Sequence, residues 1–320
     1  MRVYLANKII KTGGPSRFLE KFISHFKDKI TFLKHDKNYK IQKKDIIFTS
    51  GSFKFLRYIK NNIIYRVDGF LWHSNYLRET TLLKYLYEKI YNINIIILIN
   101  FSSIVIFQSK FVKKIWNKYL INKNKTFIIY NPPHKTTIKK NNSKIKKIIC
   151  IEGSFDGAFN SIHHLRSIND YQVELYGEYS VDFKNKIKSK ENIILKGHIS
   201  HHNIVKILSK RNIILFCLEL YPACSNSVIE AMNYGVPVFG FRTGCMNEFF
   251  GKKYKYLLDH DINDCSDNLC LKNYNLDKIF REIFINYNSI SKNIFLLSRK
   301  FNINNFKNKY FKIFNLINEK

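Results

Sequence analysis

The stretch that decides the fold runs from residue 221 to residue 248 and reads Tyr221-Pro-Ala-Cys-Ser-Asn-Ser-Val-Ile-Glu230-Ala-Met-Asn-Tyr-Gly-Val-Pro-Val-Phe-Gly240-Phe-Arg-Thr-Gly-Cys-Met-Asn-Glu248. An apolar run before it, residues 213–217, predicts a strand. Ser225 and Asn226 carry side chains that cap a helix N-terminus, and Gly235 tolerates the left-handed backbone that ends a helix. A second apolar run follows that glycine. This order of strand, loop, helix and strand predicts a βαβ unit of a parallel sheet.

The turn between that strand and helix is a place where a ligand can bind. It lies at the carboxyl edge of the predicted sheet, where ligands of doubly wound folds are found. The helix N-terminus presents unpaired N–H groups, and its dipole favours an anion by about 0.3–1 kcal/mol. A diphosphate fits this position. Glu230 lies a turn or more into the helix, so a nucleotide bound this way would bring its ribose near that carboxylate.

The same alternation of short apolar runs and amphipathic segments extends along the whole chain. An α/β fold is predicted, with two doubly wound Rossmann-like domains and C-terminal helices. The first helix is expected to begin near Ser16, and helical spacing resumes from about Leu276. The strands are expected at residues 3–6, 46–50, 63–67, 104–108 and 127–130, and then at 147–151, 171–176, 192–195, 213–217 and 236–241.

A breaker, Asn131-Pro132-Pro133, and the polar, basic stretch after it separate the two series. The predicted division is an N-terminal domain over 1–134, a linker over 135–147, a second domain over 148–290 and helices over 291–320. Those last helices can pack back on the N-terminal domain.

The charge of the chain is strongly positive, with 54 Lys and Arg against 24 Asp and Glu, or +30. Such a charge attracts nucleic acid, anionic lipid or phosphorylated substrates. However, Lys, Ile and Asn are abundant throughout, no short block concentrates the charge, and no RNA-binding signature is present. We therefore favour a compositional origin and expect no nucleic-acid partner.

The cysteines and the apolar segments indicate the cellular compartment of the protein. The six cysteines form no C-x-x-C pair and no zinc spacing, which favours a reduced, cytoplasmic compartment. The N-terminus lacks a signal-peptide core. The most apolar segment, 93–107, is too short and too polar to span a bilayer, which takes about 20 apolar residues. We expect a cytoplasmic protein that can lie at the inner face of the membrane.

Two segments of the stretch quoted above resemble a known family. Residues 227–238, Ser-Val-Ile-Glu-Ala-Met-Asn-Tyr-Gly-Val-Pro-Val, resemble the donor-binding signature of the retaining glycosyltransferases of family 4, which have the GT-B fold. Residues 243–248 resemble the family's glycine-rich segment that ends in a glutamate. The resemblance implies two Rossmann-like domains facing a cleft, with 1–134 on the acceptor side and 148–290 binding the donor.

The activity that this resemblance implies is transfer of a sugar from a nucleotide diphosphate sugar to a hydroxyl of a glycan or glycolipid. The acceptor would belong to lipopolysaccharide or a cell-surface polysaccharide. The reaction would proceed with retention of configuration and would need no metal and no cofactor besides the nucleotide sugar.

Further landmarks of the family occur along the chain, and they imply roles for individual residues. The N-terminal landmarks are Gly13–Leu19, Tyr65–Gly69, Phe107–Phe111 and Tyr130–Pro132, and Leu195–His198 follows in the second half. Asp68 is the implied catalytic carboxylate. Arg17 and Arg66 are candidates for acceptor or phosphate contacts. The implied donor-binding residues are Gly13, Gly14, Lys196, Gly197, Ser225, Asn226, Ser227, Glu230 and Glu248.

Two departures from the family pattern stand out. Pro222 occupies the position of the first of the family's paired glutamates, and Glu219 comes three residues too early, so it substitutes only if the loop is rearranged. Because that acid contacts the donor sugar, the sugar is not identified. The stretch 151–160 also lacks the family's phosphate-binding Arg and Lys. The helix dipole, backbone N–H groups and Arg17, Arg66 or Lys196 would then meet the phosphate charge.

Several residues keep a plain structural alternative. Asp68 precedes Gly69 and fits a turn equally well. The group His198, His201 and His202 fits a loop or helix start better than a metal site, and Asp259-His260-Asp261 fits a solvated loop better than a metal-binding pair. The region of Trp72 and Tyr76 fits sugar stacking and core packing alike.

Two other functions remain open at this point. One is another GT-B activity on nucleotide sugars, such as an epimerase or a hydrolase. The other is a basic protein that binds nucleic acid or membrane. Peripheral contact with an anionic membrane is also compatible with the transferase.

Overall fold

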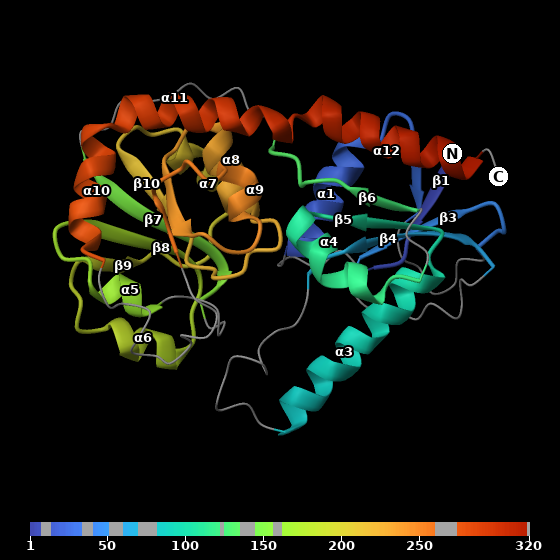
Figure 1. Ribbon diagram of the computed structural model, residues 1–320, viewed down its shortest axis with the longest axis horizontal. Coiled ribbons are helices and arrows are strands. Elements are labelled where there is room, and N and C mark those ends of the chain that lie inside the picture. Colours follow the sequence, from blue (N-terminus) through green and yellow to red (C-terminus); the bar gives the residue numbers. More distant parts are fainter. Residues whose placement is uncertain are drawn as a thin grey trace. The chain divides into compact units, whose positions relative to one another are not determined.

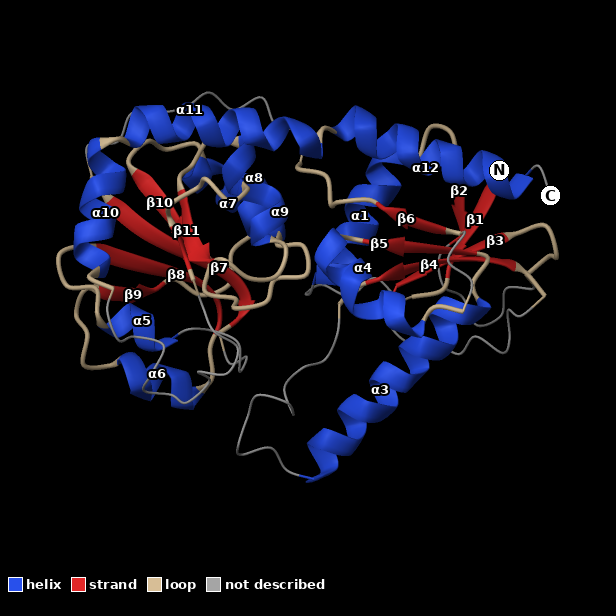
Figure 2. Cartoon of the chain, in the orientation of Figure 1, coloured by secondary structure: helices blue, strands red, loops and turns tan. Residues whose placement is uncertain are grey.

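The computed structural model describes residues 1–7, 14–33, 41–50, 60–69, 82–121, 125–134, 145–155, 162–259 and 274–318. The chain forms two compact units, Met1–Pro132 with Ile303–Lys320 as unit 1 and Pro133–Asn302 as unit 2 (Figure 1). Each unit contains a parallel six-stranded sheet with helices (Figure 2). This arrangement confirms the predicted α/β fold with two Rossmann-like domains.

Unit 1 has the strand order β2-β1-β3-β4-β5-β6, with every pair parallel. The order reverses at the first strand, so the switch point of the sheet lies between β1 and β3. The elements are β1 (Arg2–Leu5), α1 (Gly14–Phe26), β2 (Thr31–Leu33), β3 (Ile46–Ser50), β4 (Asn62–Val67), α3 (Leu82–Phe101), β5 (Ile104–Phe107), α4 (Lys110–Trp116), a 3-10 turn (Asn117–Tyr119), β6 (Thr126–Ile128) and α12 (Ile303–Asn318).

The core of unit 1 joins the two ends of the chain. Phe22 of α1 packs on Phe48 of β3 and on Tyr310 of α12, with ring centroids 4.6 and 4.8 Å away. Phe306 and Phe314 of α12 are buried in the same cluster. Burial of one such ring contributes about 1.5–3 kcal/mol. The C-terminal helix is therefore part of the core of unit 1, and the boundary falls after residue 302 rather than after 290.

Unit 2 has the strand order β12-β11-β10-β7-β8-β9, again all parallel. This is the classical dinucleotide-fold order, with its switch point between β7 and β10. The elements are β7 (Lys147–Ser154), α5 (Ile162–Arg166), β8 (Gln172–Glu178), α6 (Val181–Ile187), β9 (Ile193–Leu195), α7 (His201–Leu208), β10 (Ile213–Phe216), α8 (Asn226–Asn233), β11 (Val238–Phe241), α9 (Met246–Phe250), β12 (Leu257–Leu258), α10 (Leu276–Ile285), α11 (Tyr287–Ser298) and a 3-10 turn (Arg299–Phe301).

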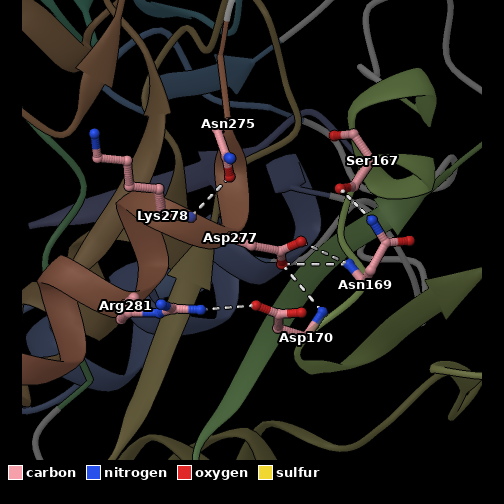
Figure 3. A network of polar contacts seen from close by, with 7 residues as sticks. All are labelled: Ser167, Asn169, Asp170, Asn275, Asp277, Lys278 and Arg281. Atoms are coloured by element: carbon pink, nitrogen blue, oxygen red, sulfur yellow. Dashed lines mark hydrogen bonds and ion pairs between the residues drawn. The ribbon is translucent and has the colours of Figure 1, made fainter.

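A surface network fixes the start of α10 against the turn that precedes β8 (Figure 3). The Asp277 carboxylate accepts hydrogen bonds from the backbone N–H groups of Asn169 and Asp170 at 3.1–3.2 Å. Arg281 pairs with Asp170 at 3.2 Å, and Asn275 caps the helix. Exposed ion pairs of this kind contribute about 0–1 kcal/mol, so the network mainly sets the position of α10.

The predicted strands are present, with ends that differ by at most a few residues. The sequence patterns did not predict the short edge strands β2 and β12 or the helix α3. The apolar segment 93–107 divides between α3 and β5, and the break comes at Ser102, whose N–H and hydroxyl both donate to the Leu98 carbonyl. Among the described residues, no helix combines the length and apolar character needed to cross a bilayer.

Candidate functional site

The N-terminus of α8 is built as the sequence predicted. Ser225 is its N-cap, and the Ser225 Oγ accepts a hydrogen bond from the Val228 N–H at 3.4 Å and lies 3.0 Å from the Ser227 Oγ. Asn226 is the first helical residue. The side chains of residues 225–227 are half-buried, so they stay accessible to a ligand. The first N–H groups of a helix have no partner inside it and can donate to a bound group.

The other end of α8 explains how the helix is held on the sheet. Gly235 has φ 60°, and its N–H donates to the Met232 carbonyl at 2.9 Å, which confirms the predicted helix end. The N–H of Val236 donates to the Ala231 carbonyl at 2.8 Å and leads into β11. Val228 and Ile229 are buried beneath the helix. Packing at both ends places the start of α8 at the carboxyl end of β10, beside the switch point.

Glu230 lies one turn into α8 and is only 3 % exposed. Its Oε1 accepts a hydrogen bond from the His134 N–H at 3.0 Å, and the His134 Nε2 lies 4.0 Å from the same oxygen. The Glu230 carboxylate thus connects α8 to His134, at the beginning of unit 2 in the chain. Sequence reasoning missed this contact because the two residues are far apart in the chain.

The segment that ends in Glu248 packs on the loop between β10 and α8. Gly244 has φ 55°, and a Cβ at this position would lie 2.5–2.7 Å from atoms of Pro222. The Cys245 N–H donates to the Pro222 carbonyl at 2.8 Å, and the Thr243 hydroxyl donates to the Leu220 carbonyl. Pro222, which replaces the expected acid, is therefore a packing partner of Gly244. Glu248 itself lies half-buried in the first turn of α9.

Two carboxyl groups meet at the switch point of unit 2. Glu152 lies near the end of β7, and Glu219 follows the neighbouring strand β10. Burial, together with the charge of Glu219, raises the pKa of Glu152 to about 8, although the backbone N–H groups of Leu218 and Glu219 donate to its carboxylate. Burial raises the pKa of Glu219 to about 7. Two such groups titrate as a pair, so they hold a proton near neutral pH.

Glu152 was not singled out from the sequence, although a signal was present. The tripeptides Cys150-Ile-Glu152 and Cys217-Leu-Glu219 end two apolar runs in the same way. Adjacent parallel strands carry their carboxyl ends at one edge, so the strand order predicts that both acids lie at that edge, although the register with Ile149 beside Leu215 offsets the two tripeptides by one residue. The pairing of β7 with β10 supplies that order.

Lys196 and Gly197 follow β9 on the same carboxyl edge. The Lys196 Nζ lies 3.9 Å from a carboxylate oxygen of Glu174, which also accepts from Lys147 at 2.6 Å. Gly197 has φ 72°, and its N–H donates to the Tyr179 hydroxyl at 2.9 Å. With strands about 4.8 Å apart, the end of β9 lies roughly 14 Å along the edge from the end of β10.

Arg66 contacts side chains from all four of the family landmarks predicted in unit 1. This residue is 1 % exposed, and its Nη2 donates to the side chains of Gln108 at 2.9 Å and Asn131 at 2.5 Å. Its Nη1 forms an ion pair with Asp68, and the guanidinium lies 3.7 Å from the centroid of the Phe18 ring. The guanidinium proposed for phosphate or acceptor contacts is therefore buried and shared among these partners, and it holds Asp68 at the end of β4.

The switch point of unit 1 is polar but uncharged. The Asn7 Oδ1 accepts from the Thr49 hydroxyl at 2.8 Å and from the Ser50 N–H at 2.7 Å. Gly14 begins α1. The other residues predicted near this edge, namely Gly13, the Arg17 side chain, Trp72 and Tyr76, lie outside the described residues.

The residues considered as metal ligands do not form a metal site. In the part of the chain that the structure describes, no group of three or more His, Cys, Asp or Glu side chains is placed to hold an ion. His201 begins α7, at the end of the loop that contains His198. Asp259 is exposed and pairs with Arg242 at 3.0 Å, while His260 and Asp261 lie outside the described residues.

Comparison with solved structures identifies the architecture. Sucrose-phosphate synthase from Thermosynechococcus elongatus superposes with a TM-score of 0.73 at 10 % identity, over 99 % of this chain and 98 % of that one. Anabaena HepE, in complex with UDP and glucose, gives 0.68 at 11 % identity over 98 % and 99 %. The lipopolysaccharide outer core galactosyltransferase WaaB gives 0.62 at 14 % identity over 98 % and 99 %. The fold is that of the GT-B glycosyltransferases.

Sequence-based comparisons add nothing to this assignment. No protein-family model matches the chain, and no curated protein matches it either. At 10–14 % identity the solved GT-B structures share the fold, so any role for individual residues has to come from the geometry of the chain itself.

Proposed function

We propose that this chain is a glycosyltransferase that moves a sugar from a nucleotide diphosphate sugar to a hydroxyl of a glycan or glycolipid. The observation that carries the proposal is the start of α8, with the Ser225 cap and the buried Glu230 one turn further on. The helix lies at the carboxyl edge beside the switch point, where dinucleotide folds bind their ligands. The crystallised complex of HepE with UDP and glucose, a GT-B neighbour, supports the same class of donor.

In this proposal the donor lies along the carboxyl edge of unit 2. The diphosphate accepts hydrogen bonds from the N–H groups at the start of α8, with the side chains of Ser225, Asn226 and Ser227 beside it. Negative charge grows on the leaving diphosphate, and preorganised N–H dipoles stabilise it without reorganisation. Glu230 accepts a hydrogen bond from the ribose, and the nucleotide base extends toward Lys196 and Gly197. Glu248, in the first turn of α9, completes the donor contacts.

Unit 1 supplies the acceptor side of the proposed reaction. Asp68, held by Arg66, orients the acceptor hydroxyl or stabilises positive charge at the anomeric carbon. Gly13, Gly14 and Arg17 are proposed to approach the donor phosphates. Membership of family 4, retention of configuration and independence from metal and other cofactors rest on the sequence resemblance and belong to this proposal.

The decisive experiment is a binding measurement with a matched pair of variants. The purified protein is screened for thermal stabilisation by a panel of nucleotide sugars, since a bound ligand raises apparent stability by mass action. We expect Glu230→Ala to weaken binding of the selected donor by about tenfold or more, the scale of a lost hydrogen bond to a charged group. Glu191→Gln, an exposed position of unit 2, serves as the control and should bind normally.

The same protein distinguishes the transferase from other GT-B activities. Product analysis with and without a glycan or glycolipid acceptor should show that sugar release depends on the acceptor. Turnover that is indifferent to the acceptor would identify a hydrolase or an epimerase instead. Unchanged donor affinity in Glu230→Ala, with circular dichroism like that of the wild type, would disprove the ribose assignment.

A lipid-linked acceptor is supported by the exposed face of α3. Residues 82–93 of this helix expose large apolar side chains, and the chain as a whole carries +30. Exposed apolar side chains can enter the membrane interface, and a positive net charge adds attraction to anionic lipids. The exposed residues are Leu82, Leu83, Leu86, Tyr87, Ile90 and Ile93.

The proposed membrane contact is tested by sedimentation with vesicles. We expect binding to anionic but not to zwitterionic vesicles. Leu83→Ser with Ile90→Ser should reduce this binding at least tenfold, because full burial of one such apolar side chain contributes roughly 1.5–3 kcal/mol. Ile121→Ser, at an exposed position elsewhere in unit 1, is the matched control. Equal binding by the α3 double variant would exclude this helix as the contact.

A further inference from the structure

The turn that follows β9 is held on β8 by the side chain of Tyr179. The Tyr179 hydroxyl accepts a hydrogen bond from the Gly197 N–H at 2.9 Å and donates one to the Leu175 carbonyl of β8. The same Leu175 carbonyl accepts from the Lys196 N–H at 2.8 Å. The Gly197 carbonyl accepts from the Gly177 N–H at 3.0 Å. One phenol oxygen therefore completes the hydrogen bonds that fix the turn at residues 196–197.

The ring of Tyr179 is held by two buried aromatic rings. It stacks on Phe155, with centroids 5.3 Å apart and an interplanar angle of 21°, and on Phe183 at 5.7 Å and 22°. Phe155 follows β7 and Phe183 belongs to α6, and neither ring is more than 2 % exposed. Stacked aromatic pairs contribute about 0.5–1.5 kcal/mol beyond the burial of their area. Because these contacts hold the ring, the Tyr179 hydroxyl is presented to Gly197 in a fixed position.

Gly197 has an open side at this carboxyl edge. Its φ is 72°, and a Cβ at this position would meet no atom of the described residues within 4 Å. Its N–H and its carbonyl are both bonded, so the turn is fixed while the side of its Cα atom stays clear. Glycine at such a position lets a ligand approach the backbone closely.

We propose that Tyr179 is a positioning residue for the nucleobase of the donor, because its hydroxyl fixes Gly197 so that a flat base can lie against the open side of the Cα atom. The inference rests on the proposed function, in which the base extends toward Lys196 and Gly197. Tyr179 contacts no reacting atom and acts through the turn alone. Burial raises the pKa of the Tyr179 hydroxyl, so the hydroxyl keeps the proton that it donates near neutral pH.

The test compares ligands with and without a base. Isothermal titration calorimetry is run with UDP, GDP, ADP and dTDP, and with inorganic pyrophosphate. Tyr179→Phe keeps the stacked ring and removes only the hydroxyl, which leaves the Gly197 N–H without its acceptor. The nucleoside diphosphate that binds wild type most tightly should lose about tenfold in affinity, the scale of one buried hydrogen bond, whereas pyrophosphate should bind equally to both proteins. Tyr274→Phe, at an exposed position of unit 2, is the control and should match wild type.

A kinetic readout separates positioning from simple structural support. In the transfer assay, Tyr179→Phe should raise the donor KM about tenfold and leave kcat unchanged. The base lies away from the reacting bond, so its contacts are the same in the ground state and in the transition state.

A second pair of variants tests the open side of the turn. Gly197→Ala adds a methyl group there and should weaken the same nucleoside diphosphate about tenfold, with no change for pyrophosphate. Gly251→Ala is the matched control, because Gly251 has φ 73° and a Cβ there would also meet no described atom within 4 Å. Both variants carry the same backbone strain, so a difference in nucleotide affinity reports the contact with the base.

The outcomes separate this inference from the proposed function. A wild type that binds no nucleoside diphosphate and no nucleotide sugar overturns both. A wild type that binds, with unchanged nucleotide affinity in Tyr179→Phe, overturns the inference alone. Equal losses for pyrophosphate and nucleotide also overturn it, since the hydroxyl would then support the whole edge. If Tyr179→Phe fails to fold, the comparison of Gly197→Ala with Gly251→Ala decides the question, and equal affinities would overturn the inference.

Discussion

The two sheets share one architecture but carry different charges at their carboxyl edges. In unit 1 the edge has a buried cation, Arg66, paired with the half-buried Asp68, and an uncharged switch point around Asn7. In unit 2 the switch point has two like groups, Glu152 and Glu219. Opposite charges attract each other, whereas two like charges brought together favour retention of a proton. The same fold therefore carries an ion pair at the carboxyl edge of one unit and two acids with raised pKa values at that of the other.

The largest loss of stability is expected when the positive charge of Arg66 is removed from the carboxyl edge of unit 1. Arg66→Met leaves Asp68, Gln108 and Asn131 without their shared donor, and removal of one partner of a buried ion pair costs about 3–5 kcal/mol. Urea unfolding followed by circular dichroism should show this loss. Lys27→Met, at an exposed position of unit 1, should change stability by less than about 0.5 kcal/mol. An equally small loss in Arg66→Met would mean that the cluster is unimportant for unit 1.

A smaller effect is expected where the loop between β10 and α8 packs on Gly244. Gly244→Ala places a Cβ against the Pro222 backbone at a positive φ, so a loss of about 2–3 kcal/mol is expected together with weaker donor binding. Gly153→Ala is the matched control, because its Cβ meets no atom within 4 Å and its φ is not positive. Thermal unfolding of both variants gives the comparison. If Gly244→Ala is as stable as Gly153→Ala, the contact with Pro222 does not hold the loop.

The smallest effect is the pH dependence of stability at the like-charge edge. Burial raises the folded-state pKa of both acids, so the folded protein binds more protons than the unfolded chain above about pH 4.5. Their contribution is thus fully present below that pH and is lost as the pH rises through about 7 to 8. Because both carboxyl groups are only half-buried, solvent screens part of this effect, and Glu219→Gln should gain on the order of 1 kcal/mol relative to wild type between pH 5 and pH 8.5.

That prediction is measured by urea unfolding of wild type and variant at both pH values. The difference between the two proteins cancels the contributions of histidines and other groups common to both. A Glu219→Gln protein whose stability runs parallel to that of the wild type would show that the two acids do not interact.

Local sequence patterns were sufficient for most elements but not for all. The sequence predicts the strand 46–50 from its short, mainly apolar run, which the structure buries throughout. It predicts the amphipathic helix near Ser16 from apolar residues that repeat with the helical period. The edge strands β2 and β12 have only three and two residues, too few for a period to show. The helix α3 was missed because its apolar residues surround it almost completely at its start, which hides the period.

The candidate site shows the same division. The cap at Ser225, the helix end at Gly235 and the position of Glu230 one turn into α8 follow from adjacent residues, so the sequence alone determined them. The pairing of Glu152 with Glu219 and the hydrogen bonds from Arg66 to Gln108 and Asn131 join residues more than 40 positions apart. Only the order and register of the strands brought them together, because the charge on a side chain is a local property, whereas its neighbours are set by the packing of the whole sheet.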